Sequence, residues 1–326
     1  MGEFDLIQRF FLEGQGRLAA DDDEVPVGIG DDCAVINPTP GMQWLVSSDM
    51  LVEGRHFLST VAPERLGHKA LAVNLSDLAA CGATPRAFTL ALSLPRADEV
   101  FLAGFARGLF ALAQAHGIAL VGGDTTAGPL NICITVMGEV PRGQALLRSG
   151  AQAGDDIYVS GSTLGDARLA LEVFRGAQAL PGDAFERVRR AMELPQPRVA
   201  LGQALRGLAS SAIDVSDGLC GDLSHILNRS GVGARLKVDA LPRSDILAAQ
   251  DLALQRMCTL SGGDDYELVF TAAPGRRADV EAAAARAATP VTRIGRIEAE
   301  PGLRLLDAQG QVLPLAMPSF DHFKTA

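Results

Sequence analysis

Aspartate recurs beside glycine or serine along this sequence of 326 residues. Carboxylate and hydroxyl oxygens are hard ligands, and with few histidines or cysteines nearby they favour Mg²⁺ over zinc. Mg²⁺ usually takes one or two carboxylates and completes its coordination with water and phosphate oxygens. Glycines beside the acids let backbone N–H groups approach phosphates closely. The pattern therefore indicates a magnesium and nucleotide-polyphosphate site. The motifs are residues 28–32, 47–49, 74–78, 122–126, 214–218 and 261–267.

Each motif also has a purely structural interpretation. An aspartate at a strand end or a helix start is most often a cap or a turn former. Asp77 is different, because it stands inside an otherwise apolar helical pattern. An ionised carboxylate there is costly unless it is paired or bound to a metal. Several acidic loops converging at one sheet edge would repel one another without cations between them. We therefore expect aspartates from both halves of the chain to share magnesium.

Several kinds of nucleotide-binding protein are excluded by missing motifs. Lysine occurs only at positions 69, 237 and 324, and no GxxxxGK[ST] is present, which excludes a P-loop NTPase. The absence of HRD and DFG excludes a protein-kinase fold. The formal charge of −10 argues against nucleic-acid binding through overall charge.

Location and redox state follow from the ends of the chain and from the cysteines. The charged N-terminus does not fit a signal peptide, and no stretch of about 20 apolar residues predicts a membrane span. The five cysteines are scattered and form no CxxC pair, which predicts reduced thiols in a cytoplasmic protein and no zinc site.

The elements that must position these motifs form a mixed α/β chain of the α+β kind, since no GxGxxG follows a strand. A polar, glycine-rich stretch at 143–154 predicts a boundary between domains 1–148 and 149–326. The predicted strands are 33–36, 43–48, 87–94, 119–121, 131–140, 157–160, a strand ending at Asp214, 234–238, 267–272 and 291–297. The predicted helices are 63–81, 97–116, 166–174, 184–193, 197–208, 218–228 and 277–288.

A weak internal echo links the two halves. Residues 74–78 resemble 214–219, and residues 122–124 resemble 262–264. Two similar halves and two independent uses of acidic turns both explain this echo, and the sequence leaves the choice open.

The six motifs in this order, together with residues 320–323, resemble the thiamine-monophosphate kinase family. Its wider superfamily includes aminoimidazole ribonucleotide synthetase and selenophosphate synthetase. The resemblance implies a two-domain PurM-like fold and a homodimer built through the N-terminal domains. It also implies the phosphorylation of thiamine monophosphate to thiamine diphosphate, with ATP as donor and several Mg²⁺ ions.

The resemblance also implies residue roles, carried over position by position. The implied metal ligands are Asp32, Ser47, Ser48, Asp49, Asp77, Asp124, Asp214 and, at a further metal position, Asp217. The implied ATP contacts are Gly123, Asp124, Arg148 and Ser216, and the implied substrate contacts are His56, Asp264 and Phe320. Asp264 and Ser48 depart from the pattern, where many relatives carry Glu and Thr. Without the resemblance, Arg148 fits a surface turn and a phosphate contact about equally, His56 an ordinary loop and Phe320 a core position.

This reaction needs no general base from the protein. The nucleophile is a phosphate oxygen, and with a second pKa of about 6 it is already ionised at about pH 7. The barrier is the approach of two polyanions, which Mg²⁺ offsets. Two alternatives stay open: another ATP-dependent enzyme of the superfamily, and a non-catalytic Mg²⁺-nucleotide-binding protein. Selenophosphate synthesis fits least, because the pattern of that family has an N-terminal cysteine or selenocysteine near a lysine, and no lysine precedes Lys69 in this sequence.

Overall fold

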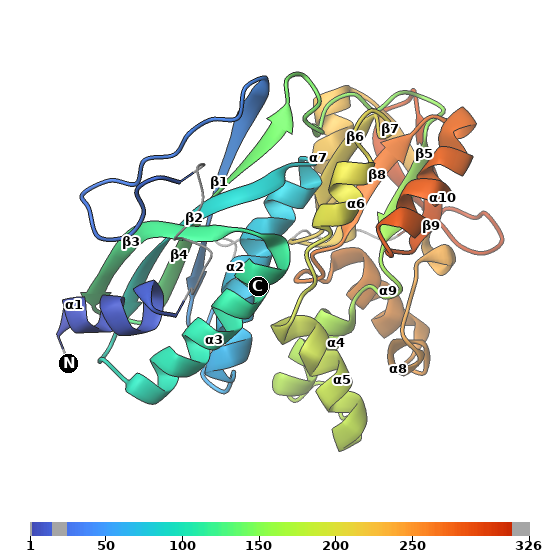
Figure 1. The fold of residues 1–326 in the computed structure, drawn as a ribbon. Helices are drawn as coiled ribbons and strands as arrows, with labels where there is room; N and C mark the ends of the chain where they lie inside the picture. The colour runs from blue at the N-terminus through green and yellow to red at the C-terminus, as the bar shows by residue number, and fades with distance from the viewer. Residues whose placement is uncertain (1, 15–24, 315–326) are drawn as a thin grey trace. The chain divides into compact units, whose positions relative to one another are not determined.

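The computed structural model describes residues 2–14 and 25–314, and these form two compact units. The first unit is Met1–Leu78 with Ala83–Gly143, and the second is Ala79–Gly82 with Gln144–Ala326. Each unit contains its own mixed sheet with helices (Figure 1). The chain passes into the second unit after Gly143, at the start of the polar stretch 143–154. The division at residue 148 stays a prediction.

The sheet of the first unit has the order β1-β4-β2-β3. Its strands are β1 (Met42–Val52), β2 (Thr84–Leu94), β3 (Ala119–Ala127) and β4 (Asn131–Pro141). Strand β4 pairs antiparallel with both β1 and β2, whereas β2 and β3 are parallel. A parallel pair requires a long crossover, and helix α3 (Glu99–His116) supplies it. Asp98 caps α3 by accepting the N–H groups of Val100 and Phe101, and Gly117 ends it in the left-handed conformation.

Two helices of this unit, α2 (Pro63–Ala80) and α3, pack tightly against each other. A Cβ at Gly67 would meet the carbonyl oxygen of Phe105, and a Cβ at Gly108 would meet that of Glu64. Both positions therefore need glycine. Alternate residues of the strands are buried, such as Ile132, Ile134 and Val136 in β4. Short helical turns at Glu3–Leu6 and Ile7–Leu12 precede the sheet.

The sheet of the second unit has the order β10-β7-β9-β5-β8-β6. Only β10 and β7 are parallel; the other pairs are antiparallel. One core cluster includes Ile226, Val269 and Ile294. The strands are β5 (Asp156–Ser160), β6 (Ser211–Asp214), β7 (Gly233–Lys237), β8 (Leu268–Ala272), β9 (Val291–Glu298) and β10 (Gly302–Leu306). The helices are α4 (Asp166–Phe174), α5 (Gly182–Glu193), α6 (Val199–Ala204), α7 (Leu219–Ser230), α8 (Asp245–Ala248), α9 (Leu252–Ser261) and α10 (Arg277–Arg286).

The structure corrects several predicted elements. No strand forms at 33–36, where Val35 makes only an isolated bridge with Val27, because this short run meets no neighbouring strand. The helix predicted at 197–208 is only Val199–Ala204. The motif at 122–126 lies inside β3 and Ser47–Asp49 lie inside β1, where both were predicted at strand ends. Ladder pairing sustains both strands through these polar residues. No helix in the described part of the chain combines the length and apolarity that a membrane crossing requires.

Candidate functional site

Three predicted metal ligands come together between β1 and α2. Ser47 Oγ donates a hydrogen bond of 2.5 Å to Asp77 Oδ2. The Asp49 N–H donates to Asn74 Oδ1 at 3.1 Å, and the Asn74 side chain, 1% exposed, donates back to the Ala70 carbonyl at 3.0 Å. These bonds hold the middle of the strand against the middle of the helix. The resulting group of hydroxyl and carboxylate oxygens suits a hard cation such as Mg²⁺.

Ser48 lies on the other face of the same strand, because successive strand residues point to opposite faces. Its hydroxyl contacts Thr135 Oγ1 at 3.0 Å and donates to the Ile134 carbonyl at 3.2 Å, both on β4. Within one sheet, Ser47 and Ser48 therefore present their hydroxyls to different sides. These contacts place the Ser48 hydroxyl against β4, on the face opposite to Ser47, and its role as a metal ligand stays a prediction.

Asp124 is separated from Asp49 by the width of the sheet. The register aligns Asp49 with Ile134, Ile134 with Leu90, and Leu90 with Gly123. Three strand spacings amount to roughly 14 Å. A single Mg²⁺ has ligand distances of about 2.1 Å, so Asp49 and Asp124 of one chain do not share an ion in this arrangement. The expectation that these acids meet at one sheet edge is not met within the first unit, because Asp124 lies on the far strand.

His56 lies in the turn after β1, where one contact holds its ring and another holds its backbone carbonyl. The Val52 N–H donates to His56 Nδ1 at 3.0 Å, which assigns the imidazole proton to Nε2. Lys69 Nζ donates to the His56 carbonyl at 3.3 Å, and the Lys69 side chain is only 2% exposed. These contacts place the ring proton on Nε2 and hold the His56 turn against α2. Sequence reasoning missed the contribution of Lys69, although a lone lysine within an apolar helix was a visible signal.

In the second unit, the motifs at 214–218 and 261–267 lie side by side. The Asp264 N–H donates to the Ser216 carbonyl at 2.9 Å, and the Tyr266 N–H donates to the Val215 carbonyl at 2.9 Å. Asp264 has a φ of 70°, a left-handed conformation that aspartate tolerates better than most residues. The structure thus brings the predicted nucleotide contact Ser216 next to the predicted substrate contact Asp264.

Asp222 of α7 holds this turn from the other side. Its Oδ2 accepts the N–H of Ser216 at 3.0 Å and the N–H of Asp217 at 3.1 Å. The pKa of Asp222 is raised to about 7: burial and then the neighbouring charge of Asp217 raise it, whereas the two N–H groups and the charge of Arg148 lower it. Sequence reasoning did not single out Asp222, whose signal was an acid in the first turn of a predicted helix.

The remaining predicted site residues are placed as follows. Asp32 is exposed in an irregular segment, where its N–H donates to Asp31 Oδ1 at 2.8 Å. Asp214 ends β6 and is 5% exposed. Arg148 is exposed and belongs to the second unit. Phe320 lies outside the described residues. Within residues 2–14 and 25–314, no group of three or more His, Cys, Asp or Glu side chains is arranged to hold a metal ion by those residues alone.

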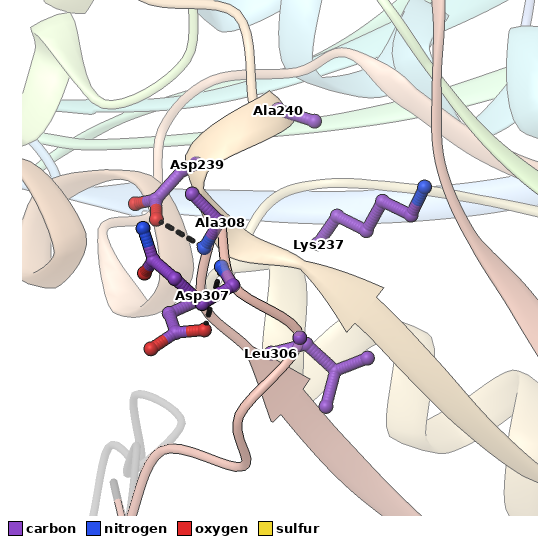
Figure 2. A pocket seen from close by; sticks show the side chains of 8 residues that line it. Lys237, Asp239, Ala240, Leu306, Asp307 and Ala308 are labelled. Atoms are coloured by element: carbon purple, nitrogen blue, oxygen red, sulfur yellow. Dashed lines mark hydrogen bonds between the residues drawn. The ribbon is translucent and has the colours of Figure 1, made fainter.

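A separate hollow of about 510 Å³ lies at the ends of β7 and β10 (Figure 2). Lys237, Asp239 and Leu306 contribute to its lining, which contains none of the predicted site residues. The Asp239 carboxylate accepts the Ala308 N–H at 2.9 Å and pairs with Arg256. Both contacts of this carboxylate are made within the fold.

Two buried acids behind the Asp264 turn make stability depend on pH. Asp265 Oδ1 accepts the Gly165 N–H at 2.8 Å, while its Oδ2 is buried and has no hydrogen-bond partner within the described chain. Burial raises the pKa of Asp265 well above its usual value. Burial also raises the pKa of Asp166, whose Oδ1 accepts the Ser244 hydroxyl at 2.6 Å. Both acids therefore favour the folded state when they are protonated.

The sign of the pH effect follows from these raised pKa values. The stability that each acid contributes is fully present below its unfolded pKa, near 4, and is lost as the pH rises through the folded pKa. We expect Asp265→Asn, a neutral isostere, to raise the melting temperature by several degrees at about pH 8 and to change it little near pH 4. Thermal melts of both proteins across this range measure the difference. A parallel shift at every pH would contradict the assignment to Asp265 ionisation.

Family models of two consecutive domains match the chain. The model described as AIR synthase related protein, N-terminal domain, matches residues 30–140, and the corresponding C-terminal domain model matches residues 152–308. Together with the two mixed sheets, these matches define the class as the AIR synthase related, PurM-like proteins. HypE of E. coli shares this fold, with a TM-score of 0.77 at 22% identity over 98% of both chains.

Relatives with higher sequence identity indicate which family within this class the chain belongs to. The chain is 44% identical to a thiamine-monophosphate kinase of Salmonella typhimurium over 99% of both chains. It is 43% identical to that of Haemophilus influenzae, covering 99% of this chain and 98% of the other. A crystal structure of thiamine-monophosphate kinase from Stenotrophomonas maltophilia matches with 46% identity and a TM-score of 0.85, covering 96% and 98%.

The chain belongs to the thiamine-monophosphate kinase family and is an enzyme of the kinase class. The predicted family, the two-domain mixed α/β fold and the kinase assignment are thereby confirmed. A further structure, of AaThiL complexed with AMPPCP and TMP, matches with 29% identity and a TM-score of 0.74 over 99% of this chain and 97% of the other.

Proposed function

We propose that this chain transfers the terminal phosphoryl group of ATP to thiamine monophosphate, yielding ADP and thiamine diphosphate. The observation that carries the proposal is 43–44% identity to thiamine-monophosphate kinases over almost the full length of both chains. The related AaThiL structure holds AMPPCP and TMP, which supports ATP as the donor and thiamine monophosphate as the acceptor.

In this reaction, the side chains bind and orient groups that are already ionised. The acceptor phosphate oxygen needs no base, which agrees with a His56 ring whose Nδ1 is engaged by Val52. The His56 Nε2–H would donate to an acceptor oxygen of the substrate, held in place by the Lys69 contact beneath the turn. Asp264 and Phe320 are proposed as further substrate contacts. Gly123, Arg148 and Ser216 are proposed as nucleotide contacts.

The oxygen donors of the first unit fit magnesium. Ser47, Asp49 and Asp77 would hold the ion, and the hydrogen bond from Ser47 to Asp77 orients one carboxylate before any ion binds. When bound, Mg²⁺ neutralises phosphate charge and aligns in-line transfer. Asp32, Ser48, Asp124, Asp214 and Asp217 are proposed as additional ligands.

The test of this function is a coupled ADP-release assay with magnesium and each of three acceptors. We expect turnover with thiamine monophosphate and only background with thiamine or with the substrate of aminoimidazole ribonucleotide synthetase. Turnover with thiamine but not with its phosphate ester would redirect the assignment. Tight binding of Mg²⁺-ATP with no ADP release would favour a non-catalytic nucleotide-binding protein.

We further propose that the protein works as a cytoplasmic homodimer, joined through the sheet of the first unit. Val46 and Met50 of β1 are 66% and 54% exposed, and strand alternation places them on the face of Ser48. The register aligns Val46 with Met137 and Met50 with Cys133, both on β4. All five cysteines are present as thiols rather than disulfides, which suits the reducing cytoplasm. Apolar side chains along an exposed sheet face suit burial against a second copy.

The dimer proposal predicts that Val46→Glu yields a monomer. Burying the new carboxylate between two copies is costly, so we expect light scattering after size exclusion to give about half the wild-type mass. Val100→Glu is the matched control, because Val100 is 82% exposed at the start of α3 and outside the sheet face. A monomeric wild type, or a V46E variant that stays dimeric, would refute this interface.

A further inference from the structure

Asp222 holds a loop that the proposed reaction uses, at Ser216 and Asp217, although it belongs to the helix that follows this loop. It lies in the first turn of α7, is 3% exposed, and accepts two consecutive backbone N–H groups with one oxygen, Oδ2. The residues that donate are Ser216 and Asp217, a proposed nucleotide contact and a proposed metal ligand. One buried acceptor oxygen, Asp222 Oδ2, therefore fixes the backbone positions from which the Ser216 and Asp217 side chains extend.

The peptide group that joins Ser216 to Asp217 is held from both sides. Its N–H, that of Asp217, is bound by Asp222 at 3.1 Å, and its carbonyl, that of Ser216, accepts the N–H of Asp264 at 2.9 Å. The fit is close, because a Cβ at Gly263 would meet the Ser216 carbonyl oxygen. A shift of the Ser216 peptide is therefore transmitted to Asp264, the proposed substrate contact, rather than absorbed between the loops.

We infer that Asp222 is a positioning residue for phosphoryl transfer, which sets the nucleotide loop at Ser216–Asp217 and, through the Ser216 carbonyl, the substrate loop at Asp264. The inference rests on the proposed function. Asp222 acts through backbone groups and touches neither substrate nor nucleotide. Its required property is an acceptor oxygen at the place of Oδ2, because misplacing reacting groups by about 1 Å can cost 100-fold in rate.

A purely structural role for Asp222 is the competing explanation. Gly218 precedes α7 without a side-chain cap, so Asp222 also satisfies N–H groups just before this helix. A structural role would lower stability and leave the kinetic constants of the folded enzyme unchanged. The two explanations therefore differ in KM and kcat, and not in the melting temperature.

The experiment compares three substitutions at one position with a stability control. Asp222→Asn keeps an acceptor oxygen at the same reach, and Asp222→Glu keeps the carboxylate but moves it by one methylene. Asp222→Ala removes the acceptor. Leu223→Ala is the control. Leu223 is fully buried in the adjacent core cluster, so its replacement by alanine leaves a cavity without removing any of the loop's hydrogen bonds. For each protein we measure the melting temperature, the KM values for ATP and thiamine monophosphate, and kcat.

We expect D222A and D222E to raise both KM values at least about tenfold and to lower kcat/KM about 100-fold. D222N should stay within about threefold of wild type, and L223A should melt earlier with unchanged KM values. If D222A does not fold, the kinetic constants of D222N and D222E distinguish the positioning role from the structural role. Wild-type kinetics in D222E, or losses in D222N equal to those of D222E, would overturn the inference. An inactive wild type would instead refute the proposed function itself.

Discussion

Replacing Asp77 by asparagine should lower kcat by about 1,000-fold or more while leaving the fold intact. Asp77 accepts the Ser47 hydroxyl at 2.5 Å and, with Asp49, supplies the negative oxygens of the first unit's candidate magnesium site. An amide keeps the size and one acceptor but loses the charge. Losing several kcal/mol of charge stabilisation in the transition state corresponds to this factor, at 1.36 kcal/mol per tenfold in rate.

The measurement is kcat as a function of Mg²⁺ concentration, together with a thermal melt. Asp98→Asn is the matched control in the same unit, because Asp98 caps α3 and lies in none of the motifs. We expect this control to keep its activity. Full activity of D77N at saturating Mg²⁺ would remove Asp77 from the proposed site.

The second large effect concerns the stability of the second unit. Glu267 is 6% exposed and accepts the Ser160 hydroxyl at 2.5 Å. Arg198 binds the same carboxylate through two nitrogens. Its Nε donates to Oε2 at 2.7 Å, and its Nη2 donates to Oε1. Glu267→Ala leaves a largely buried guanidinium without this partner. Breaking a buried pair in this way costs about 3–5 kcal/mol, so we expect the free energy of unfolding to fall by that amount.

Urea denaturation followed by circular dichroism measures this loss, and Asp245→Ala provides the comparison. Asp245 pairs with Arg187 in two short contacts, but the two side chains are 74% and 60% exposed. An exposed pair contributes about 0–1 kcal/mol. If E267A and D245A lost the same stability, burial would not be what makes the Glu267 pair strong.

Local signals in the sequence predicted much of the fold. Helix α3 was expected at 97–116 and runs over Glu99–His116, because its cap at Asp98, its apolar period and its glycine stop at Gly117 all act within a few residues. The same local signals failed where an element depends on its neighbours. Strand β10 was missed because five residues, Gly302–Leu306, become a strand only by pairing with β7. Helix α9, Leu252–Ser261, was missed because its apolar face shows only when packed in a core cluster.

The sequence by itself determined the family, the motifs and the chemistry of hard oxygen ligands, since residue types and their order are enough for these. Only the tertiary structure decided which of the predicted site residues lie next to one another. It joined Ser47 to Asp77 and Ser216 to Asp264, and it separated Asp49 from Asp124 by the width of a sheet. It also revealed that Asp222 holds the Ser216 turn. The physical reason is that the face of a side chain depends on strand register and helix packing, which join residues far apart in the chain.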